Sequence, residues 1–268
     1  MNYFGVSMTE FFIGTMGFSY GDWKGVFYPS GIPARDYLAY YGRIFSAVEM
    51  DTTFYAIPRP AVVRGWADAV PGNFRFTAKT PQLITHEMGL TNSGQYMAEF
   101  INTMRFLKDK LGVILIQLPP KYTSDKLPIL TTFLGNLPDD IRFAIEFRHR
   151  SWYSPQTAEL LSAHCIGWVA TEYADLPHQI TLTADFTYIR WLGKHAAFRH
   201  YDREQVDRQQ RLAWWREQIH HSLDRAQIVY GFFNNDYAGF APATCNRLKI
   251  LLELPLVDFK QPVQGRLF

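Results

Sequence analysis

Three observations predict an α/β fold built as a closed parallel barrel. Eight short strand-like segments follow one another, helical segments separate most of them, and polar residues recur where the strands end. The 268 residues show no linker, internal repeat or break in composition, and one such barrel needs about 250 residues. We therefore expect a single TIM-type (β/α)8 barrel domain over residues 1–268.

The strands are predicted from short segments that are either continuously apolar or alternating. VILIQL is apolar throughout, as expected of a strand buried on both faces, whereas FRFTAK alternates, with Arg75, Thr77 and Lys79 on one face. An open doubly wound sheet is the competing architecture, but its Gly-rich phosphate fingerprint is absent after the first strand. We expect strands at residues 11–15, 47–50, 74–79, 113–118, 142–152, 166–171, 186–192 and 228–233.

Helices are predicted from apolar periodicity and from helix-start residues. Pro60 suits a first helical turn, and Ser154 with Pro155 supplies an N-cap and a first-turn residue. Residues 173–185 have no helical period, so we expect one outer helix to be missing or replaced by a loop after the sixth strand. We expect helices at residues 35–45, 60–69, 95–110, 127–137, 155–164, 205–223 and 241–252.

Three segments lie outside this alternation. Residues 1–10 are interpreted as a leader, and residues 253–268 as an extended tail that belongs to the domain or is peripheral to it. The loop at residues 16–33 is Gly-rich and aromatic, and it is too long for a simple connector. We expect this loop either to be an exposed binding surface or to pack down over a pocket as a lid.

The segment RFAIEFRHRSW, residues 142–152, is the most informative strand candidate. Alternation places Phe143, Ile145 and Phe147 on one face, and Ala144, Glu146 and Arg148 on the other. This pattern suits a barrel strand whose bulky residues meet the outer helices and whose charged residues reach one rim. His149 falls on the opposite face from Arg148, and Trp152 is expected to pack.

Composition limits the class of protein. The net charge is +2 and no basic tail is present, so nucleic-acid binding is not favoured. Two widely separated cysteines indicate a reduced, intracellular protein. No signal peptide or membrane-spanning run is evident, so we expect a cytoplasmic protein without membrane association. Aromatic residues make up 16% of the chain, and we expect most of them to pack.

Side chains alternate between the two faces of a strand, and this parity predicts which of them point into the barrel. It predicts that polar side chains converge at the carboxyl ends of the strands, where barrels of this type have their active sites. Several of these residues also have plain structural interpretations: an ion pair between Glu146 and Arg148, and turn formation by the two asparagines. The candidate catalytic residues are Glu49 and Glu146. The candidate substrate-binding residues are Ser19, Tyr20, Tyr55, Lys79, His86, Gln117, Arg148, Arg190, Asn234 and Asn235.

The charge balance of this set indicates the ligand. Two carboxylates facing three cations favour a small anion, such as a phosphate or carboxylate, and Arg148 and Arg190 are suited to grip it bidentately. Glu49 and Glu146 are candidates for a general acid/base pair, or for hydrogen bonds to sugar hydroxyls. No cofactor or metal site is expected, since His149 and Glu172 form no tight ligand motif with them.

Seven motifs in order resemble the YecE-like family, the domain of unknown function 72. They are GTMGFSYGDWKGVFYP, VEMDTTFYAIP, FRFTAKTPQLITH, VILIQLPP, AIEFRHRSW, TADFTYIRWLG and FFNNDYAGFAP, and they span nearly the whole chain. The resemblance implies a TIM-type barrel and no established reaction. Many relatives resemble YVRLHG where this chain has YIRWLG, so Leu192 stands in place of a His. A mechanism that needs this His is not expected here unless His195 substitutes for it.

Three functional hypotheses follow. The first is an enzyme that acts on a small anionic or sugar-like substrate by acid/base chemistry, of hydrolase or isomerase type. The second, by analogy of fold alone, is a metal-dependent enzyme that processes nucleic acid, and it requires a basic groove and Glu and His ligands. The third is a non-catalytic ligand-binding protein that uses the aromatic loop. The substrate and the oligomeric state are not defined by the sequence.

Overall fold

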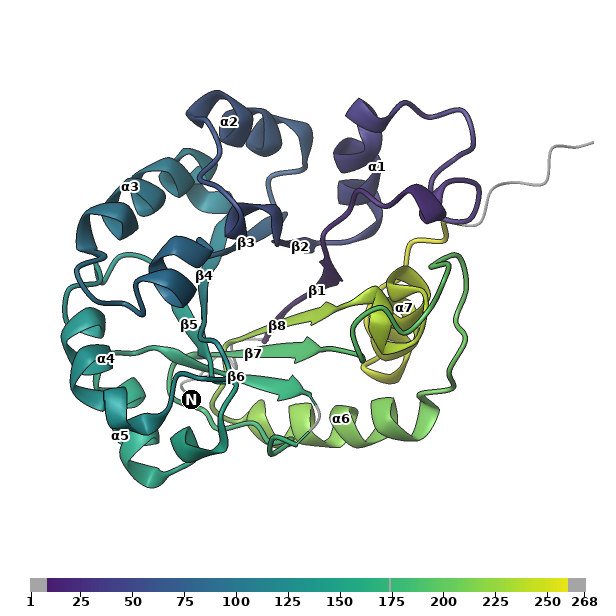
Figure 1. Cartoon of the computed structure of the whole chain (residues 1–268). Coiled ribbons are helices and arrows are strands. Elements are labelled where there is room, and N and C mark those ends of the chain that lie inside the picture. Colours follow the sequence, from purple (N-terminus) through teal and green to yellow (C-terminus); the bar gives the residue numbers. More distant parts are fainter. Residues whose placement is uncertain (1–8, 174, 260–268) are drawn as a thin grey trace, which may run out of the picture.

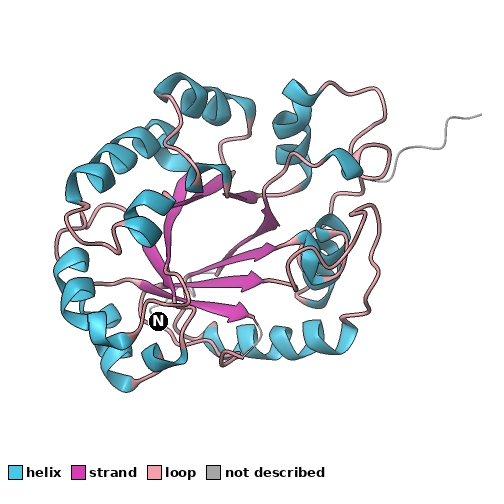
Figure 2. Ribbon diagram, in the orientation of Figure 1, coloured by secondary structure: helices cyan, strands magenta, loops and turns pink. Residues whose placement is uncertain are grey.

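Eight parallel strands form a closed ring that helices surround (Figures 1 and 2). The computed structural model describes residues 9–173 and 175–259. Each strand pairs with the next in the chain, and β8 closes the ring by pairing with β1. The strands are β1 Glu10–Met16, β2 Ala47–Met50, β3 Arg75–Lys79, β4 Leu111–Gln117, β5 Phe143–Glu146, β6 Gly167–Glu172, β7 Phe186–Trp191 and β8 Ile228–Phe233. The predicted TIM-type barrel is confirmed.

The outer layer consists of helices that follow most of the strands (Figure 1). As predicted, residues 173–185 between β6 and β7 contain no helix in the part that the structure describes. None of the helices in the described chain is long and apolar enough to cross a membrane. The helices are α1 Tyr37–Ile44, α2 Pro60–Ala69, α3 Gly94–Met104, α4 Leu127–Leu134, α5 Pro155–Ala163, α6 Gln209–Ser222 and α7 Ala241–Leu251.

The alternation predicted for β5 is confirmed by two separate apolar clusters. Phe143, Ile145 and Phe147 belong to the large cluster between barrel and helices, whereas Ala144 belongs to the smaller cluster inside the barrel. Interior residues from other strands, such as Val113 on β4, fill the barrel below the rim, because successive side chains of a strand point to opposite faces. Polar residues on the inner face near the strand ends therefore reach the rim.

Several predicted boundaries are wrong. The strand expected over residues 142–152 ends at Glu146, and Arg150–Trp152 forms a 3-10 helix, since β5 pairs with β6 only at Ala144 and Ile145. The segment expected to start a helix at residue 205 is held by a backbone bond from Gln205 to Ala238 instead, so α6 begins later. The helix expected at 95–110 ends at Met104 and continues as the 3-10 segment Arg105–Lys110.

The two ends of the chain also differ from the predictions. Glu10, which was assigned to the leader, is the first residue of β1, and the rest of the leader before residue 9 lies outside the described residues. In the described part of the tail, Phe259 packs at 5.1 Å from the ring of Phe27 and 6.3 Å from that of Phe240. The tail beyond residue 259 lies outside the described residues.

The aromatic loop after β1 packs inward. Trp23, Phe27 and Tyr28 are at most 1% exposed, and Tyr28 stacks on Tyr37 of α1 at 3.9 Å. The indole nitrogen of Trp23 donates a hydrogen bond of 3.2 Å to Asn235. The prediction of an exposed aromatic surface is therefore wrong for the rings that the loop buries, because burying such rings stabilises the fold more than exposing them.

Candidate functional site

Arg190 on β7 is the centre of a buried ion network at the carboxyl end of the barrel. Its Nε and Nη2 donate hydrogen bonds of 3.0 and 2.7 Å to the two carboxylate oxygens of Glu49 on β2. Its Nη1 donates to Oε2 of Glu146 at the end of β5. Both carboxylates are fully buried and Arg190 is 4% exposed. The barrel thus brings together three residues that the sequence predicted for the site.

Arg148 extends this network toward the surface. Its Nε is in ion-pair contact with Oε1 of Glu146, without the geometry of a hydrogen bond. Its guanidinium also lies over the ring of Tyr173, 4.2 Å from the centroid. Since 12% of its side chain is exposed, Arg148 can contact a bound molecule, whereas Arg190 is almost completely covered.

Tyr188 is part of the network, although the sequence analysis did not single it out. It lies two residues before Arg190 on the same inner face of β7, and its hydroxyl donates a 2.7 Å hydrogen bond to Glu49. The Tyr188 hydroxyl is also 2.9 Å from Oγ1 of Thr77 on β3. Tyr188 could have been predicted from the sequence, because a residue two positions before Arg190 on a strand faces the same side. Burial, followed by the charge of Glu49, raises the pKa of Tyr188, which keeps the hydroxyl protonated.

Charge pairing keeps the network ionised. Burial alone would raise the pKa of Glu146, but the positive charges of Arg148 and Arg190 outweigh burial and hold that pKa below its usual value. Burial would likewise lower the pKa of Arg190, and the charges of Glu146 and Glu49 reverse the effect and raise it. A buried charge is tolerated when it is paired and hydrogen-bonded, as each of these is.

Lys79 lies closer to the surface than Glu49. Glu49 pairs in register with Thr77 of β3, and Lys79 is the next inward residue of that strand. Its backbone oxygen accepts a 2.7 Å hydrogen bond from Thr53, and its Nζ lies 3.8 Å from the centroid of the Phe54 ring. Burial and then the charge of Arg190 lower the pKa of Lys79 from 10.5 to about 8.

His86 lies beside Lys79 on one side of the rim. It was predicted in a loop, but it forms part of the π-helix Leu83–Glu87. Its ring meets the ring of Phe54 edge-on at 5.0 Å, and its Nδ1 is 2.8 Å from Oγ1 of Thr85. Burial, followed by the charges of Lys79, Arg148 and Lys121, lowers the pKa of His86. This side of the rim is therefore cationic, and His86 is neutral at neutral pH.

The adjoining part of the rim, after β2 and β8, is acidic. Burial and the charge of Glu49 raise the pKa of Asp51, which directly follows β2. Tyr20 donates a 2.6 Å hydrogen bond to the backbone of Met16, and burial together with the charges of Asp51, Glu49 and Asp236 raises the pKa of Tyr20. The rim is thus electrostatically divided, with cations after β3, β4 and β5 and carboxylates after β2 and β8.

The remaining predicted residues have different surroundings. Gln117 is 8% exposed, stands level with Glu146 and lies on the inner face of β4, as expected. Ser19 is exposed, and Tyr55 is 75% exposed beyond the network. Asn234 accepts a hydrogen bond from the backbone of Asp236, as a turn former does, and is half-buried.

Asn235 points away from the barrel interior and has a structural role. Its side-chain oxygen accepts hydrogen bonds from Trp23 and from the backbone nitrogen of Ala241, the first residue of α7. It thereby joins the aromatic loop to the last helix. The structure does not bring Asn235 to the Glu49–Arg190–Glu146 network.

Two acidic or basic residues considered at the sequence level also lie elsewhere. Glu172 is on the outer face of β6, where it accepts hydrogen bonds from Arg211, Trp215 and Tyr237. The side chain of His195 is fully exposed, whereas Leu192 packs against the cluster inside the barrel. No group of three or more His, Cys, Asp or Glu residues in the described chain is arranged to hold a metal ion.

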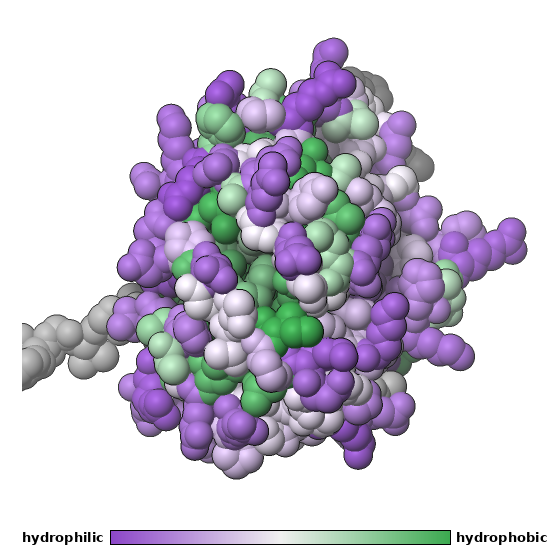
Figure 3. Space-filling model, turned by 60° about the vertical axis from the view of Figure 1, so that its left-hand side comes forward, coloured by the Kyte–Doolittle hydropathy of each residue, from purple (hydrophilic) through white to green (hydrophobic). Residues whose placement is uncertain are grey.

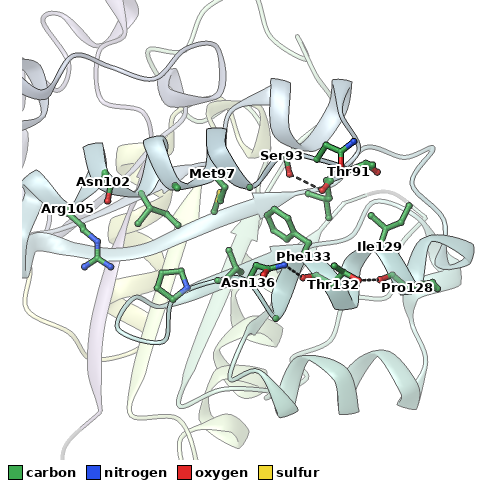
Figure 4. Close-up of a pocket in the computed structure, with 18 residues that line it drawn as sticks. Thr91, Ser93, Met97, Asn102, Arg105, Pro128, Ile129, Thr132, Phe133 and Asn136 are labelled. Carbon is green, nitrogen blue, oxygen red and sulfur yellow. Dashed lines mark hydrogen bonds between the residues drawn. The ribbon is translucent and has the colours of Figure 1, made fainter.

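A groove with a volume of about 990 Å³ lies away from the rim, between α3 and α4 (Figure 4). Met97 of α3 and Phe133 of α4 line the groove. The space-filling view in Figure 3 shows apolar side chains around a shallow hollow, with hydrophilic side chains surrounding them. Arg105, the charged residue among its described lining residues, is paired with Asp140 in an exposed ion pair. The groove offers no buried ionisable group, so the rim remains the candidate site.

Comparison of the sequence with known proteins finds one family and similar proteins within it. A family model described as "Protein of unknown function DUF72" matches residues 12–265. The UPF0759 protein YecE of Escherichia coli (strain K12) is 35% identical over 114 residues, which are 42% of this chain and 42% of that protein. The UPF0759 protein YunF of Bacillus subtilis (strain 168) is 25% identical, covering 91% of this chain and 95% of its own.

Solved structures of DUF72 family proteins have the same fold as this chain. A crystal structure of a DUF72 family protein from Thermotoga maritima MSB8 superposes with a TM-score of 0.79 at 28% identity, covering 91% of this chain and 99% of that one. A DUF72 family protein from Enterococcus faecalis V583 has a TM-score of 0.75 at 23% identity, covering 95% of this chain and 99% of its own, and supports the fold.

Proposed function

The chain belongs to the DUF72 family of proteins of unknown function, and we propose that it is an enzyme that uses acid/base chemistry. The rim geometry supports a small substrate that is either sugar-like or anionic, with a phosphate or carboxylate group. The observation that carries the proposal is the cluster of Lys79, His86 and Arg148 at the carboxyl end of the strands, above a buried ion network. In barrels of this type the active site lies at this end.

The divided charge of the rim supports a particular orientation of the substrate. Arg148 and Lys79 provide positive charge for a phosphate or carboxylate group, and Arg148 adds a planar fork of donors. Asp51 on the other side provides acceptors for hydroxyl groups, whereas Asp236 already accepts hydrogen bonds from Tyr201 and from the backbone nitrogen of Ala197. A small sugar-like molecule with one anionic end satisfies both sides at once.

The proposal assigns different roles to the buried and the partly exposed groups. Glu49 and Glu146, predicted from the sequence as an acid/base pair, have no exposed surface, and both carboxylates face arginine. They hold Arg190 and Arg148 in position and set the local charge. Lys79, with its pKa near 8, exchanges protons near neutral pH, because a general acid or base works best when its pKa is close to the working pH.

Anion binding tests the first part of the proposal. Purified protein is titrated with orthophosphate, with phosphorylated sugars and with small carboxylates, and the melting temperature and heat of binding are measured. An anion should stabilise the protein, and Arg148→Gln should weaken its binding roughly tenfold, since a charge-assisted hydrogen bond contributes about 1.5–3 kcal/mol. Arg148→Lys keeps the charge but removes the fork, and its affinity should be intermediate.

Arg75→Gln is the matched control for a general loss of positive charge. Arg75 lies on the same strand and the same inner face as Lys79, at the opposite end of the barrel, over the ring of Phe12. Its substitution should leave anion affinity unchanged. Equal weakening by Arg75→Gln and Arg148→Gln, or no binding of any anion by the native protein, contradicts the proposed site.

Turnover tests the second part. Each compound that binds is incubated with the protein, and products are followed by mass spectrometry and phosphorus NMR. Lys79→Gln should abolish conversion, while ligand binding is weakened only in part because Arg148 remains. Ligands that bind at the rim but are never converted identify a non-catalytic binding protein and contradict the assignment as an enzyme.

A further inference from the structure

Lys79 has an unusual position for a lysine. In the part of the chain that the structure describes, no hydrogen bond or ion pair links its Nζ to another residue, although Glu146 and Glu49 are close enough to influence it electrostatically. The ammonium group instead lies over the face of Phe54, at 3.8 Å from the ring centroid. An amine without a carboxylate partner keeps its lone pair available once it loses its proton.

Burial and neighbouring cations favour that loss, whereas the face of the Phe54 ring, which attracts a cation, opposes it. The side chain is only partly exposed, and Arg190 and Arg148 are the cationic groups near it. Glu49 and Glu146, which influence Lys79, are already engaged by arginine. Asp51 also influences Lys79, and burial and the charge of Glu49 raise the pKa of Asp51, which weakens its negative charge. Desolvation and neighbouring cations are the two conditions that convert a lysine into a nucleophile.

We infer that Lys79 is a nucleophilic amine that forms an imine with a small anionic aldehyde or ketone, such as a 2-oxo acid or a phosphorylated carbonyl compound. The inference rests on the proposed function and deepens it, because it names the functional group that an anionic substrate must carry. Arg148, which is close enough to influence Lys79 electrostatically, binds the anionic group, and the amine of Lys79 attacks the carbonyl carbon.

The reaction balances without an oxidant or a metal. The lone pair of the neutral amine attacks the carbonyl carbon, a C–N bond forms, and the carbonyl π electrons move to oxygen, which takes up a proton. The nitrogen loses one proton, which gives a carbinolamine. The hydroxyl then takes up a proton, the C–O bond breaks as water leaves, and the nitrogen lone pair forms the C=N bond of an iminium ion. Loss of the remaining N–H proton gives the imine and returns the proton that the hydroxyl took up. Amine and carbonyl thus give imine and water, and His86, which is neutral at neutral pH, can relay the protons.

Reductive trapping on the native protein tests the inference. The protein is incubated at about pH 7 with glyoxylate and sodium cyanoborohydride, which reduces an imine to a stable secondary amine, and peptides are mapped by mass spectrometry. Acetaldehyde serves as the uncharged aldehyde, and the exposed residue Lys121 is the internal reference. Lys79 should be labelled by glyoxylate about ten times faster than Lys121, because the lowered pKa of Lys79 increases the neutral fraction of its amine at this pH.

Two further results are expected. Lys79→Arg, checked for folding by its melting curve, should lose the rapid adduct and keep the slow labelling of surface lysines. Arg148→Gln should slow labelling by glyoxylate severalfold and leave labelling by acetaldehyde unchanged. Equal rates of Lys79 labelling with the charged and the uncharged aldehyde in the native protein contradict an anionic substrate.

The outcome separates this inference from the proposed function. If orthophosphate binds in an Arg148-dependent way but Lys79 reacts no faster than Lys121, the imine inference is wrong and the anion site stands. If Lys79 reacts rapidly with both aldehydes and no anion binds, the amine is nucleophilic but the proposed anionic substrate is wrong. If neither labelling nor anion binding is seen, both are wrong.

Discussion

Two hydrogen bonds join Arg190 of β7 to Glu49 of β2 inside the barrel, although β8 and β1 lie between these strands in the sheet. Both residues are nearly or fully buried, and Glu146 approaches the same guanidinium from β5. The pair joins strands that share no backbone hydrogen bonds, so its loss should affect the barrel as a whole.

Glu49→Gln should destabilise the protein by about 3–5 kcal/mol, because it leaves Arg190 buried with half of its charge compensation removed. Urea unfolding followed by fluorescence gives the free energy. The double variant Glu49→Leu/Arg190→Met removes both charges, and it should be more stable than Glu49→Gln. A double variant that is less stable than either single variant would show that the pair does not act as an electrostatic unit.

Tyr188→Phe should cost about 1–2 kcal/mol, since it removes the hydroxyl that donates to Glu49 at 2.7 Å and contacts Thr77. Tyr230→Phe is the matched control: it changes a buried tyrosine of the same interior cluster, which is in ring contact with Tyr188 at 6.2 Å. The described chain shows no hydrogen bond from the Tyr230 hydroxyl, so its removal should cost much less. Equal losses for the two variants would contradict a specific role for the Tyr188 hydroxyl.

The stability of the protein should depend on Lys79 in alkaline solution. The folded protein lowers the pKa of Lys79 from 10.5 to about 8, so between these values the unfolded chain binds more protons at this site. Stability from this group therefore rises as the pH increases from about 8 to 10.5, and at lower pH its protonated form opposes folding. Lys79→Met should be more stable than the native protein near pH 7, and the difference should shrink as the pH rises.

Urea unfolding at several pH values measures this difference, with Lys121→Met as the control because Lys121 is exposed. The Lys121 variant controls for the loss of one exposed lysine charge. A difference for Lys79→Met that stays constant across the range would mean that folding does not lower the pKa of Lys79.

Gly193→Ala should destabilise the protein by about 3 kcal/mol or more, because overpacking against rigid backbone cannot be relieved by side-chain movement. A Cβ at Gly193 would lie 1.7 Å from the backbone oxygen of Asp236 and 2.7 Å from the backbone nitrogen of Tyr237. Gly65→Ala in α2, where a Cβ meets open space, should instead stabilise by up to about 1 kcal/mol. Thermal unfolding of the two variants compares them, and a Gly193 variant as stable as the native protein would contradict the close approach.

The sequence was sufficient to predict the barrel because strand alternation is a local property. Alternation in RFAIEFRHRSW correctly separates Phe143 and Ile145 from Ala144 and Glu146, and the aperiodic segment after β6 indicates the missing helix. The same reasoning applied to β7 would have found Tyr188, which shares the inner face with Arg190. Applied to β8, it would have excluded Asn235, which has the parity of the outward-facing Phe233.

Other features of the site could not be read from the sequence. Which carboxylate meets Arg190 depends on how strands that are not neighbours are staggered around the ring, and alternation carries no information about that offset. The contact of the Lys79 ammonium group with the ring of Phe54 could not be predicted either. It depends on the path of the chain after β2, which places Phe54 beside the amine. The end of β5 at Glu146 likewise depends on pairing with β6 rather than on composition.

The buried ion network also determines how pieces of the chain recognise each other. A cut between β4 and β5 would leave Glu49 on the first fragment and both Arg190 and Glu146 on the second. The first fragment folded alone would leave Glu49 without its arginine, and the second would carry Arg148 and Arg190 against Glu146 as their one carboxylate in the network. The two halves should therefore associate with each other in preference to a second copy of themselves, since a first half brought to another first half places Glu49 against Glu49.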